Sequence, residues 1–281
     1  MTSEYAFRIV NVFAEERLAG NPLAVFEDAR GMDDPTMQSL ALQFNLSETS
    51  FLLPSDTANA RVRIFTPASE LPFAGHPTLG SAHVVCALAS RAESLTLELA
   101  AGVIPVSVSG DVYTLQANAP KIRPARFTRE VIADLLGLRV GDIAEQPAWV
   151  NTGMEQLLIP LRSADAVGRC RPDPSLAERH ANESGMVKIY VWSDTGAEST
   201  VARFFFSKNR GVISEDPGTG SACANLGGWM VHTKRELPIN RLIYQGDRVN
   251  RPCRLYLKVD EQQRIFVGGR VVELGRGTVS L

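Results

Sequence analysis

The sequence predicts an α+β protein with two pseudo-symmetric halves, each a sheet or half-barrel wrapped on a central helix. Three observations predict this fold class. The chain resembles itself at half its length, short strand patterns dominate each half, and two long apolar segments occupy equivalent places in the halves. A chain of 281 residues has room for two domains of ordinary size.

A repeat relates the two halves. At an offset of 140 residues, RIFTPASELPFAGHPTLGSA at 63–82 aligns with RFFFSKNRGVISEDPGTGSA at 203–222, and six of the 20 positions are identical. Four of the identities lie at the Pro of GHP or EDP and just after it, where Pro and Gly restrict the backbone most. A duplicated half explains this spacing, and two unrelated strand–turn–helix units are the alternative.

Strand patterns fill the first half. AFRIVNVF and PLAVFE are short apolar or alternating runs on either side of the turn signal GNP. One helix interrupts the strands: Asp34 is expected to cap it, Pro35 to take its first position, and Asn45 to mark its end. Its apolar face comprises Met37, Leu40, Ala41 and Phe44. The sheet then continues through SETSFLLPS, ARVRIFTP, SLTLELAAG, VIPVSVSG and VYTLQAN.

The central helices are expected at 78–89, after GHP, and at 219–232, after EDP. Both segments are apolar on several faces, which is typical of helices surrounded by protein. The Pro-rich, basic segment PKIRPARFT at 120–128 resembles a linker. We therefore expect an N-terminal domain of residues 1–122 and a C-terminal domain of residues 123–270, with the last strand, about 271–281, crossing back to complete the first domain.

Composition excludes several function classes. With 29 Lys and Arg against 31 Asp and Glu, no basic excess favours nucleic acid or an anionic membrane. No signal peptide and no apolar run of membrane-spanning length is evident. The four cysteines are far apart, which favours free thiols in a cytoplasmic protein, and no metal site is expected. Nucleotide-binding glycine motifs are absent, so no cofactor is expected either.

The candidate chemistry lies at the starts of the two central helices. Helix N-termini carry unpaired N–H groups and roughly half a positive charge, so two of them pointing into one cleft between the halves suit a small carboxylate substrate or a developing carbanion. The repeat aligns His76 with Asp216, and both precede a Pro. We expect both to sit at helix entrances rather than inside helices, because the residue before Pro is extended.

A third candidate is Glu48 in NLSETSF, between the first helix and a strand. A partly buried Glu can take and return protons. Its counterpart in the second half is Val187 or Lys188, depending on the offset, so no second carboxylate is expected there. Cys86 and Cys223 lie well inside the two helices, and we interpret both as small core residues rather than bases.

These blocks together resemble the PhzF-like isomerases of phenazine biosynthesis. The resemblance rests on GNPLAVF at 20–26, NLSETSF at 45–51, FTPASELPFAGHPTLG at 65–80 and EDPGTGSA at 215–222, and it extends through most of the chain. It implies a diaminopimelate epimerase-like fold with the active site between the two halves, a homodimer, and no cofactor.

The resemblance also implies roles for individual residues. Glu48 would be the general acid/base that moves a proton, and with it a double bond, in a substrate like trans-2,3-dihydro-3-hydroxyanthranilate. His76 and Asp216 would polarise or hydrogen-bond the amino, hydroxyl or ring portion of the substrate. The substrate carboxylate would contact Gly75, Gly220 and Ser221, with Ser47 as a lesser contact.

Three functions follow as hypotheses. The first is a cofactor-independent isomerase acting on a small cyclic unsaturated carboxylic acid, for which a single base acting on one face is sufficient. The second is an amino- or hydroxy-acid racemase or epimerase on the same fold, which would differ in product stereochemistry. The third is a small-molecule-binding protein without catalysis, in which loss of Glu48 would not affect ligand binding.

Overall fold

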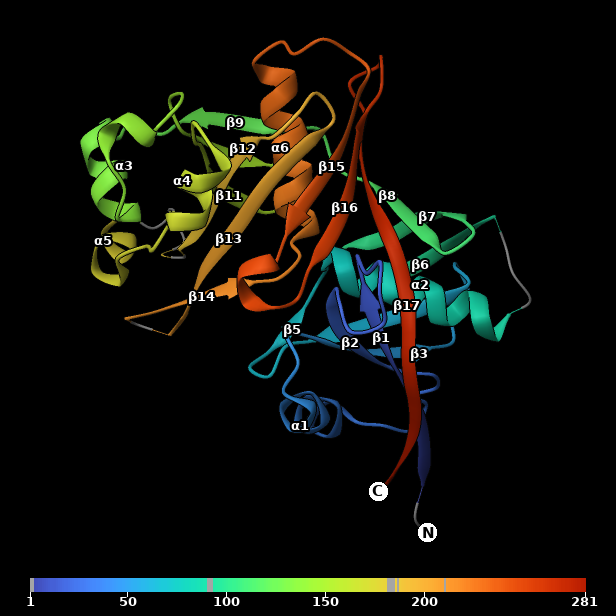
Figure 1. The fold of residues 1–281 in the computed structure, drawn as a ribbon. Helices are drawn as coiled ribbons and strands as arrows, with labels where there is room; N and C mark the ends of the chain where they lie inside the picture. Colours follow the sequence, from blue (N-terminus) through green and yellow to red (C-terminus); the bar gives the residue numbers. More distant parts are fainter. Residues whose placement is uncertain (1–2, 90–92, 181–184, 186, 210) are drawn as a thin grey trace. The chain divides into compact units, whose positions relative to one another are not determined.

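The computed structural model describes residues 3–89, 93–180, 185, 187–209 and 211–281 (Figure 1). The chain divides into two compact units. Unit 1 comprises residues 1–116 and 268–281, and unit 2 comprises residues 117–267. The division falls after Gln116, whereas the sequence analysis put the boundary after residue 122.

Strands form a closed circuit in unit 1. They pair in the order β1, β2, β3, β4, β6, β7, β8, β17 and back to β1, with β5 added beside β4. Their bounds are β1 Glu4–Val12, β2 Asn21–Phe26, β3 Thr49–Leu53, β4 Ala60–Phe65, β5 Glu70–Leu71, β6 Ser94–Leu99, β7 Gly102–Ser109, β8 Val112–Gln116 and β17 Ile265–Ser280. The last strand completes this circuit, since β17 runs antiparallel to β1 from Glu4↔Ser280 to Val12↔Val271.

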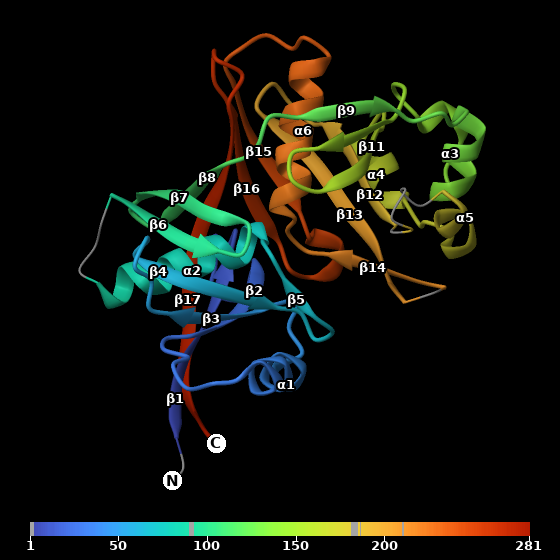
Figure 2. The same ribbon diagram turned by 180° about the vertical axis from the view of Figure 1, so that it is seen from behind.

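Helix α2 (Gly75–Leu88) fills this circuit. Figures 1 and 2, which view the molecule from opposite sides, show strands of unit 1 on both sides of α2. The helix is apolar around its circumference, and its residues from His76 to Ala82 are all buried. Gly80 allows the close approach to β2, because a Cβ there would lie 2.6 Å from the Leu23 side chain.

Helix α1 (Asp34–Phe44) packs on the outer face of the unit 1 strands. Met37, Leu40 and Ala41 contact a cluster of phenylalanines in which Phe26 and Phe51 stack at 4.9 Å. The helix ends as predicted, with Asn45 in a left-handed conformation. The predicted cap is wrong by one residue: Asp33, not Asp34, accepts from the N–H of Thr36, because Pro35 sits one position deeper in the first turn.

Unit 2 repeats the plan with a second central helix, α6 (Gly220–His232). Its strands pair as β9–β10–β11–β12–β13–β15–β16, with β14 beside β13. Their bounds are β9 Lys121–Pro124, β10 Ala148–Asn151, β11 Glu155–Pro160, β12 Lys188–Asp194, β13 Ser199–Asn209, β14 Val212–Asp216, β15 Ile239–Gln245 and β16 Cys253–Val259.

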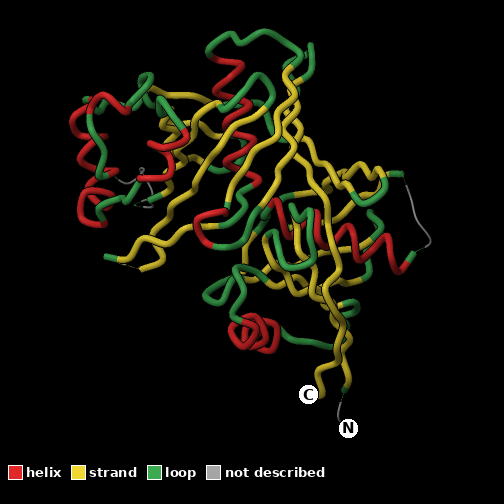
Figure 3. Tube along the Cα trace, viewed as in Figure 1, coloured by secondary structure: helices red, strands yellow, loops and turns green. Residues whose placement is uncertain are grey.

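Short helices cover the outer face of the unit 2 strands (Figure 3). They are α3 Arg129–Leu136, α4 Ala164–Arg169 and α5 Pro174–Arg179, with 3₁₀ turns η1 Val140–Asp142 and, elsewhere in the unit, η2 Asp247–Val249. Their core includes Ile132, Val167, Ile189 and Phe205. The linker prediction for 120–128 is wrong, because residues 121–124 form β9 against β10. Pro120 and Pro124 flank or end that strand, where proline is tolerated.

An arginine–glutamate pair at the same place in each unit supports the repeat. Phe65 is opposite Glu70 in β4–β5, and Phe205 is opposite Glu215 in β13–β14. In each unit the arginine two residues before the phenylalanine binds that glutamate through Nε and Nη2 and lies over the phenylalanine ring. These arginines, Arg63 and Arg203, are among the residues that the repeat aligned.

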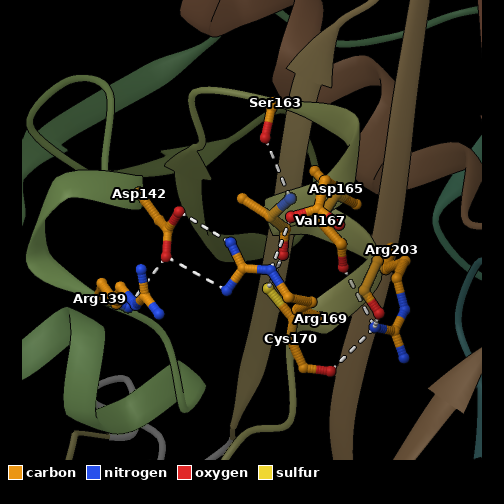
Figure 4. A network of polar contacts seen from close by, with 10 residues as sticks. Arg139, Asp142, Ser163, Asp165, Val167, Arg169, Cys170 and Arg203 are labelled. Atoms are coloured by element: carbon orange, nitrogen blue, oxygen red, sulfur yellow. Dashed lines mark hydrogen bonds and ion pairs between the residues drawn. The ribbon is translucent and has the colours of Figure 1, made fainter.

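The surroundings of the two arginines differ. Arg63 binds Asp34 of α1 at 2.6 Å as its second carboxylate. Arg203 instead donates to main-chain carbonyls at the end of α4, including Cys170 at 2.9 Å (Figure 4). The two-half fold class is confirmed, and the outer face of the strands is covered by α1 in unit 1 and by three short helices in unit 2. In the described part of the chain, no helix combines the length and the hydropathy that crossing a membrane requires.

Candidate functional site

The structure brings Glu48 and His76 together in unit 1. Glu48 Oε2 lies 3.4 Å from His76 Nε2. The His76 side chain is 7% exposed and that of Glu48 is 17% exposed, so the carboxylate keeps limited access to solvent while the imidazole is enclosed. A carboxylate in such a position can exchange a proton with a small ligand.

Local structure fixes each member of this pair. Asn45 ends α1 in a left-handed conformation, and the chain turns through two residues before β3 begins at Thr49, directly after Glu48. His76 is the second residue of α2. The expectation that His76 precedes its helix is therefore wrong: α2 starts at Gly75 and includes Pro77. A proline in the first turn costs no hydrogen bond, because N–H groups there have no partner within the helix.

His76 is held neutral. Burial lowers the pKa of His76 to about 3, and a smaller opposing effect comes from a hydrogen bond to the Pro22 carbonyl. Within the described residues His76 Nε2 has no hydrogen-bond partner of suitable geometry. Asn21 Nδ2 lies 3.4 Å from Nδ1. A neutral imidazole carries its proton on one nitrogen and accepts with the other, so Nε2 donates to Glu48 or accepts from it according to the tautomer.

The other unit 1 candidates lie beside this pair. Gly75 is the first residue of α2, next to His76, and is partly exposed. Ala74 caps α2 without a side-chain hydrogen bond. Ser47 is exposed in the turn that precedes Glu48. A helix start without a side-chain cap favours an anion.

In unit 2 the candidates gather where β14 joins α6. Asp216 is the last residue of β14 and precedes α6, as predicted for a helix entrance. Its carboxylate accepts a short hydrogen bond from the hydroxyl of Thr219, which is the N-cap residue of α6. Gln245, fully buried on β15, donates to the main-chain carbonyl of Asp216 at 2.9 Å and to the Thr219 hydroxyl at 3.0 Å. These hydrogen bonds orient Asp216 through its main-chain carbonyl and through its carboxylate.

A buried amide relay orients Ser221. Asn225 Nδ2 donates to Gln156 Oε1 at 2.8 Å, and Gln156 Nε2 donates to Ser221 Oγ at 2.9 Å. Both amides are fully buried. Because Ser221 Oγ accepts from Gln156, its own O–H is left to donate to another acceptor. Gly220 and Ser221 open α6 and are partly exposed, so this end offers main-chain and hydroxyl donors to an anion.

The cysteines are not suited to act as bases. Cys86 and Cys223 are both buried, and burial raises the pKa of the Cys223 thiol well above its usual value. A buried thiol of high pKa is unreactive at neutral pH. Within the described ranges, no three His, Cys, Asp or Glu side chains are grouped in a way that could hold a metal ion.

Sequence reasoning missed the residues that support these groups. Asn21 lies in the GNP block, which served as a turn signal and as part of the resemblance but gave no role to Asn21, and its contact with His76 joins positions 55 residues apart. Gln156, Asn225 and Gln245 carry no motif at all. A single buried amide in an otherwise apolar strand or helix is the one signal that could have drawn attention to them.

Comparisons with known proteins agree with this fold and these motifs. The family model for phenazine biosynthesis-like proteins, PhzC-PhzF, matches residues 10–277. An uncharacterized isomerase of Pasteurella multocida, PM1503, is 43% identical, covering 99% of this chain and 94% of its own. The trans-2,3-dihydro-3-hydroxyanthranilate isomerase of Pseudomonas fluorescens is 33% identical, covering 97% and 98%.

Solved structures show the same architecture. A PhzF family protein of Bacillus anthracis superposes with a TM-score of 0.87 at 25% identity, covering 99% of both chains. A hydroxyproline epimerase of Agrobacterium vitis shares the fold at a TM-score of 0.64 and 12% identity, covering 99% of this chain and 93% of its own. The chain therefore belongs to the PhzC-PhzF family of phenazine biosynthesis-like proteins and is an isomerase.

Proposed function

We propose that Glu48 is the acid/base of an isomerase that moves a proton and a double bond in a small cyclic unsaturated amino or hydroxy carboxylic acid, such as trans-2,3-dihydro-3-hydroxyanthranilate. The observation that carries this proposal is the contact of 3.4 Å between Glu48 Oε2 and the enclosed His76 Nε2. The substrate class is that of the 33% identical relative from Pseudomonas fluorescens.

In this reaction the Glu48 carboxylate removes a proton from one carbon of the substrate. The electron pair of that C–H bond forms a new double bond, and the allylic double bond shifts along the ring. Glu48, now a carboxylic acid, returns the proton to the carbon at the far end of the allylic system, so that no atom is gained or lost. A single carboxylate can serve both steps because it alternates between base and acid.

Neutral His76 suits this cycle. In the neutral tautomer with the proton on Nδ1, Nε2 can accept a hydrogen bond from Glu48 once Glu48 has taken up a proton, and so hold the acid in position. An imidazolium there would instead stabilise the carboxylate and make Glu48 a weaker base. Burial of His76 removes that competing state at neutral pH. His76 can equally accept a hydrogen bond from the substrate amino or hydroxyl group.

Strand register gives the unit 2 counterpart of Glu48. Thr49 is opposite Phe65, and Ile189 is opposite Phe205. Because Phe65 and Phe205 are equivalent, Thr49 matches Ile189 and the preceding Glu48 matches Lys188. The counterpart is therefore a lysine rather than a second carboxylate, which supports a reaction with one carboxylate base over the inversion of a stereocentre by two.

The remaining candidates are proposed as substrate-binding residues. In unit 1 the N–H groups at the start of α2, at Gly75, suit an anionic group, and in unit 2 those at the start of α6, at Gly220, together with the oriented hydroxyl of Ser221, suit a carboxylate. Asp216 suits a substrate amino or hydroxyl group, to which it offers an acceptor. Ser47, exposed beside Glu48, is the least constrained of these residues.

The test is proton exchange in deuterated water. Wild-type protein, Glu48→Gln and a matched exposed variant, Glu4→Gln on β1, are incubated with trans-2,3-dihydro-3-hydroxyanthranilate, and NMR follows deuterium uptake and double-bond position. We expect bond migration with deuterium at the new C–H position in the wild type and in Glu4→Gln, with a loss of at least about 100-fold in Glu48→Gln. Migration at an unchanged rate in Glu48→Gln would contradict the proposal.

A further inference from the structure

Lys188 on β12 is a charged side chain that the proposed reaction leaves without a role. It lies at the first position of its strand and is partly buried. Burial lowers the pKa of its ammonium group. Among the described residues, Lys188 makes no ion pair and no side-chain hydrogen bond, although unit 2 contains several arginine–carboxylate pairs. A desolvated cation without a counter-ion is unfavourable unless a ligand supplies one.

Strand pairing places Lys188 on the α6 side of the sheet. Residues directly opposite each other in neighbouring strands share a face. Lys188 is opposite Phe206, and Tyr190 is opposite Phe204, which in turn is opposite Asp216. The other face, which includes Ile189 and Phe205, packs against the short outer helices. Lys188 and Asp216 therefore project from the same face of the sheet.

Contacts along β12 show which end of α6 Lys188 approaches. The ring of Trp192 lies 4.8 Å from that of Trp229, late in the helix. Burial is the main cause that raises the pKa of Tyr190, two residues earlier in the strand, and the nearby Cys223 thiol adds to it, so Tyr190 lies close to Cys223 in the first half of α6. The strand thus runs towards the start of α6 as residue numbers fall, by about 6.6 Å for each two residues. One further step on the same face puts Lys188 level with the N-terminal end of α6.

This end of α6 is also where the partly exposed Gly220 and the oriented hydroxyl of Ser221 lie. The carboxylate of Asp216 does not neutralise Lys188: it accepts from Thr219, and no ion pair joins Lys188 to it. The start of α6 carries partial positive charge, and the Lys188 ammonium group lies on the sheet face that packs against this helix. Both therefore favour a negatively charged ligand.

We propose that Lys188 binds the carboxylate of the substrate and makes an anionic group a requirement for binding to unit 2. This inference rests on the proposed function, since it assigns a residue to the carboxylate of the same substrate class. Lys188 would act on affinity and on the choice between charged and neutral ligands, whereas Glu48 would act on the chemical step.

Two aromatic probes of similar shape separate charge from shape: anthranilate, which carries a carboxylate, and anthranilamide, which is neutral. Calorimetric titrations are compared for the wild type, Lys188→Gln, Lys188→Met and Lys188→Arg. Lys258→Gln, an exposed lysine on β16 of the same unit, is the matched control. We expect the Kd for anthranilate to rise about tenfold or more in Lys188→Gln and Lys188→Met, to recover in Lys188→Arg, and to stay unchanged in Lys258→Gln. Anthranilamide should bind all variants equally weakly.

Each outcome separates this proposal from the isomerase proposal. Wild-type affinity for anthranilate in Lys188→Gln would overturn the role of Lys188, whether or not the Glu48 experiment succeeds. Loss of anthranilate binding in Lys188→Gln, with no bond migration by the wild type, would support Lys188 and contradict the isomerase substrate. Failure of the wild type to bind anthranilate would contradict the role of Lys188, whereas bond migration in deuterated water would still decide the isomerase proposal. In a turnover assay Lys188→Gln should raise KM with little change in kcat, the reverse of the expectation for Glu48→Gln.

Discussion

Glu48 Oε2 and His76 Nε2 lie 3.4 Å apart, although one residue ends a turn before a strand and the other belongs to the first turn of a buried helix. The imidazole is neutral, so the pair is not an ion pair at neutral pH. Because His76 is buried in its neutral form, protonating it destabilises the folded protein, and this loss of stability can be measured.

We expect the free energy of unfolding to decrease as the pH falls, and protonation of His76 to account for part of this decrease. The pKa of His76 is about 3 when folded and near its ordinary 6.5 when unfolded, so between these values the unfolded chain binds more protons. The contribution is complete above pH 6.5 and is lost progressively as the pH falls towards 3. From pH 7 to pH 5 the loss is about 2 kcal/mol.

Chemical denaturation of the wild type and of His76→Gln at both pH values measures this term. The difference between the two proteins isolates His76, because His83, whose pKa is also lowered by burial, contributes equally to both. An identical pH dependence in the two proteins would contradict the neutral, buried state of His76.

The thiols should be inert. All four cysteines are buried, and burial raises the pKa of Cys223 far above neutrality. Iodoacetamide at pH 8 should therefore leave isomerase activity intact, and a thiol-reactive dye should detect none of the four thiols before denaturation and all of them afterwards. Rapid inactivation, prevented in Cys223→Ala, would instead point to a cysteine base of the kind that the sequence analysis rejected.

Gly246, directly after β15, should be essential for the close approach of this segment to Pro217, the residue after Asp216. Its φ is +84°, and a Cβ there would lie 2.2 Å from the Arg251 carbonyl oxygen and 2.5 Å from the Pro217 carbonyl oxygen. Both are main-chain atoms that cannot swing away, so Gly246→Ala should lower the free energy of unfolding by more than about 2 kcal/mol. Gly141→Ala, where a Cβ meets nothing within 4 Å, is the control and should change it by at most about 0.5 kcal/mol.

The two equivalent arginine–glutamate pairs should differ in their contribution to stability. The side chains of Arg203 and Glu215 are 13% and 9% exposed, and no second carboxylate is paired with Arg203 in the described chain. Glu215→Ala should therefore cost about 3–5 kcal/mol. Glu70 is 38% exposed and Arg63 keeps Asp34, so Glu70→Ala should cost about 1 kcal/mol or less. Thermal unfolding compares the two variants, and equal losses would show that burial does not separate them.

Backbone-restricting residues made much of the fold predictable. Prolines and glycines of the GHP and EDP blocks revealed the repeat, and alternation of apolar residues located the strands. The start of α2 was misplaced because Pro77 is compatible both with a position before a helix and with its first turn. The strand at 121–124 was missed because its pairing partner is β10, more than 20 residues later in the chain.

The site was predictable as a set of residues but not as a geometry. Motifs and resemblance named Glu48 and His76, yet their contact depends on how β3 and α2 pack, which no local pattern encodes. The counterpart of Glu48 was ambiguous between Val187 and Lys188 until strand register fixed it as Lys188. Buried amides such as Gln156 act through long-range hydrogen bonds and leave no periodic signal.

Strand β17 begins in unit 2 and ends in unit 1, where it pairs with β1 so closely that Ser3 and Leu281 exchange main-chain hydrogen bonds. Unit 1 thus needs residues from both ends of the sequence, whereas unit 2 is one continuous stretch. During synthesis, unit 1 cannot complete its strand circuit until residues 268–281 have been made, while residues 117–267 can already fold. The half of the protein that carries Glu48 is made first and finished last.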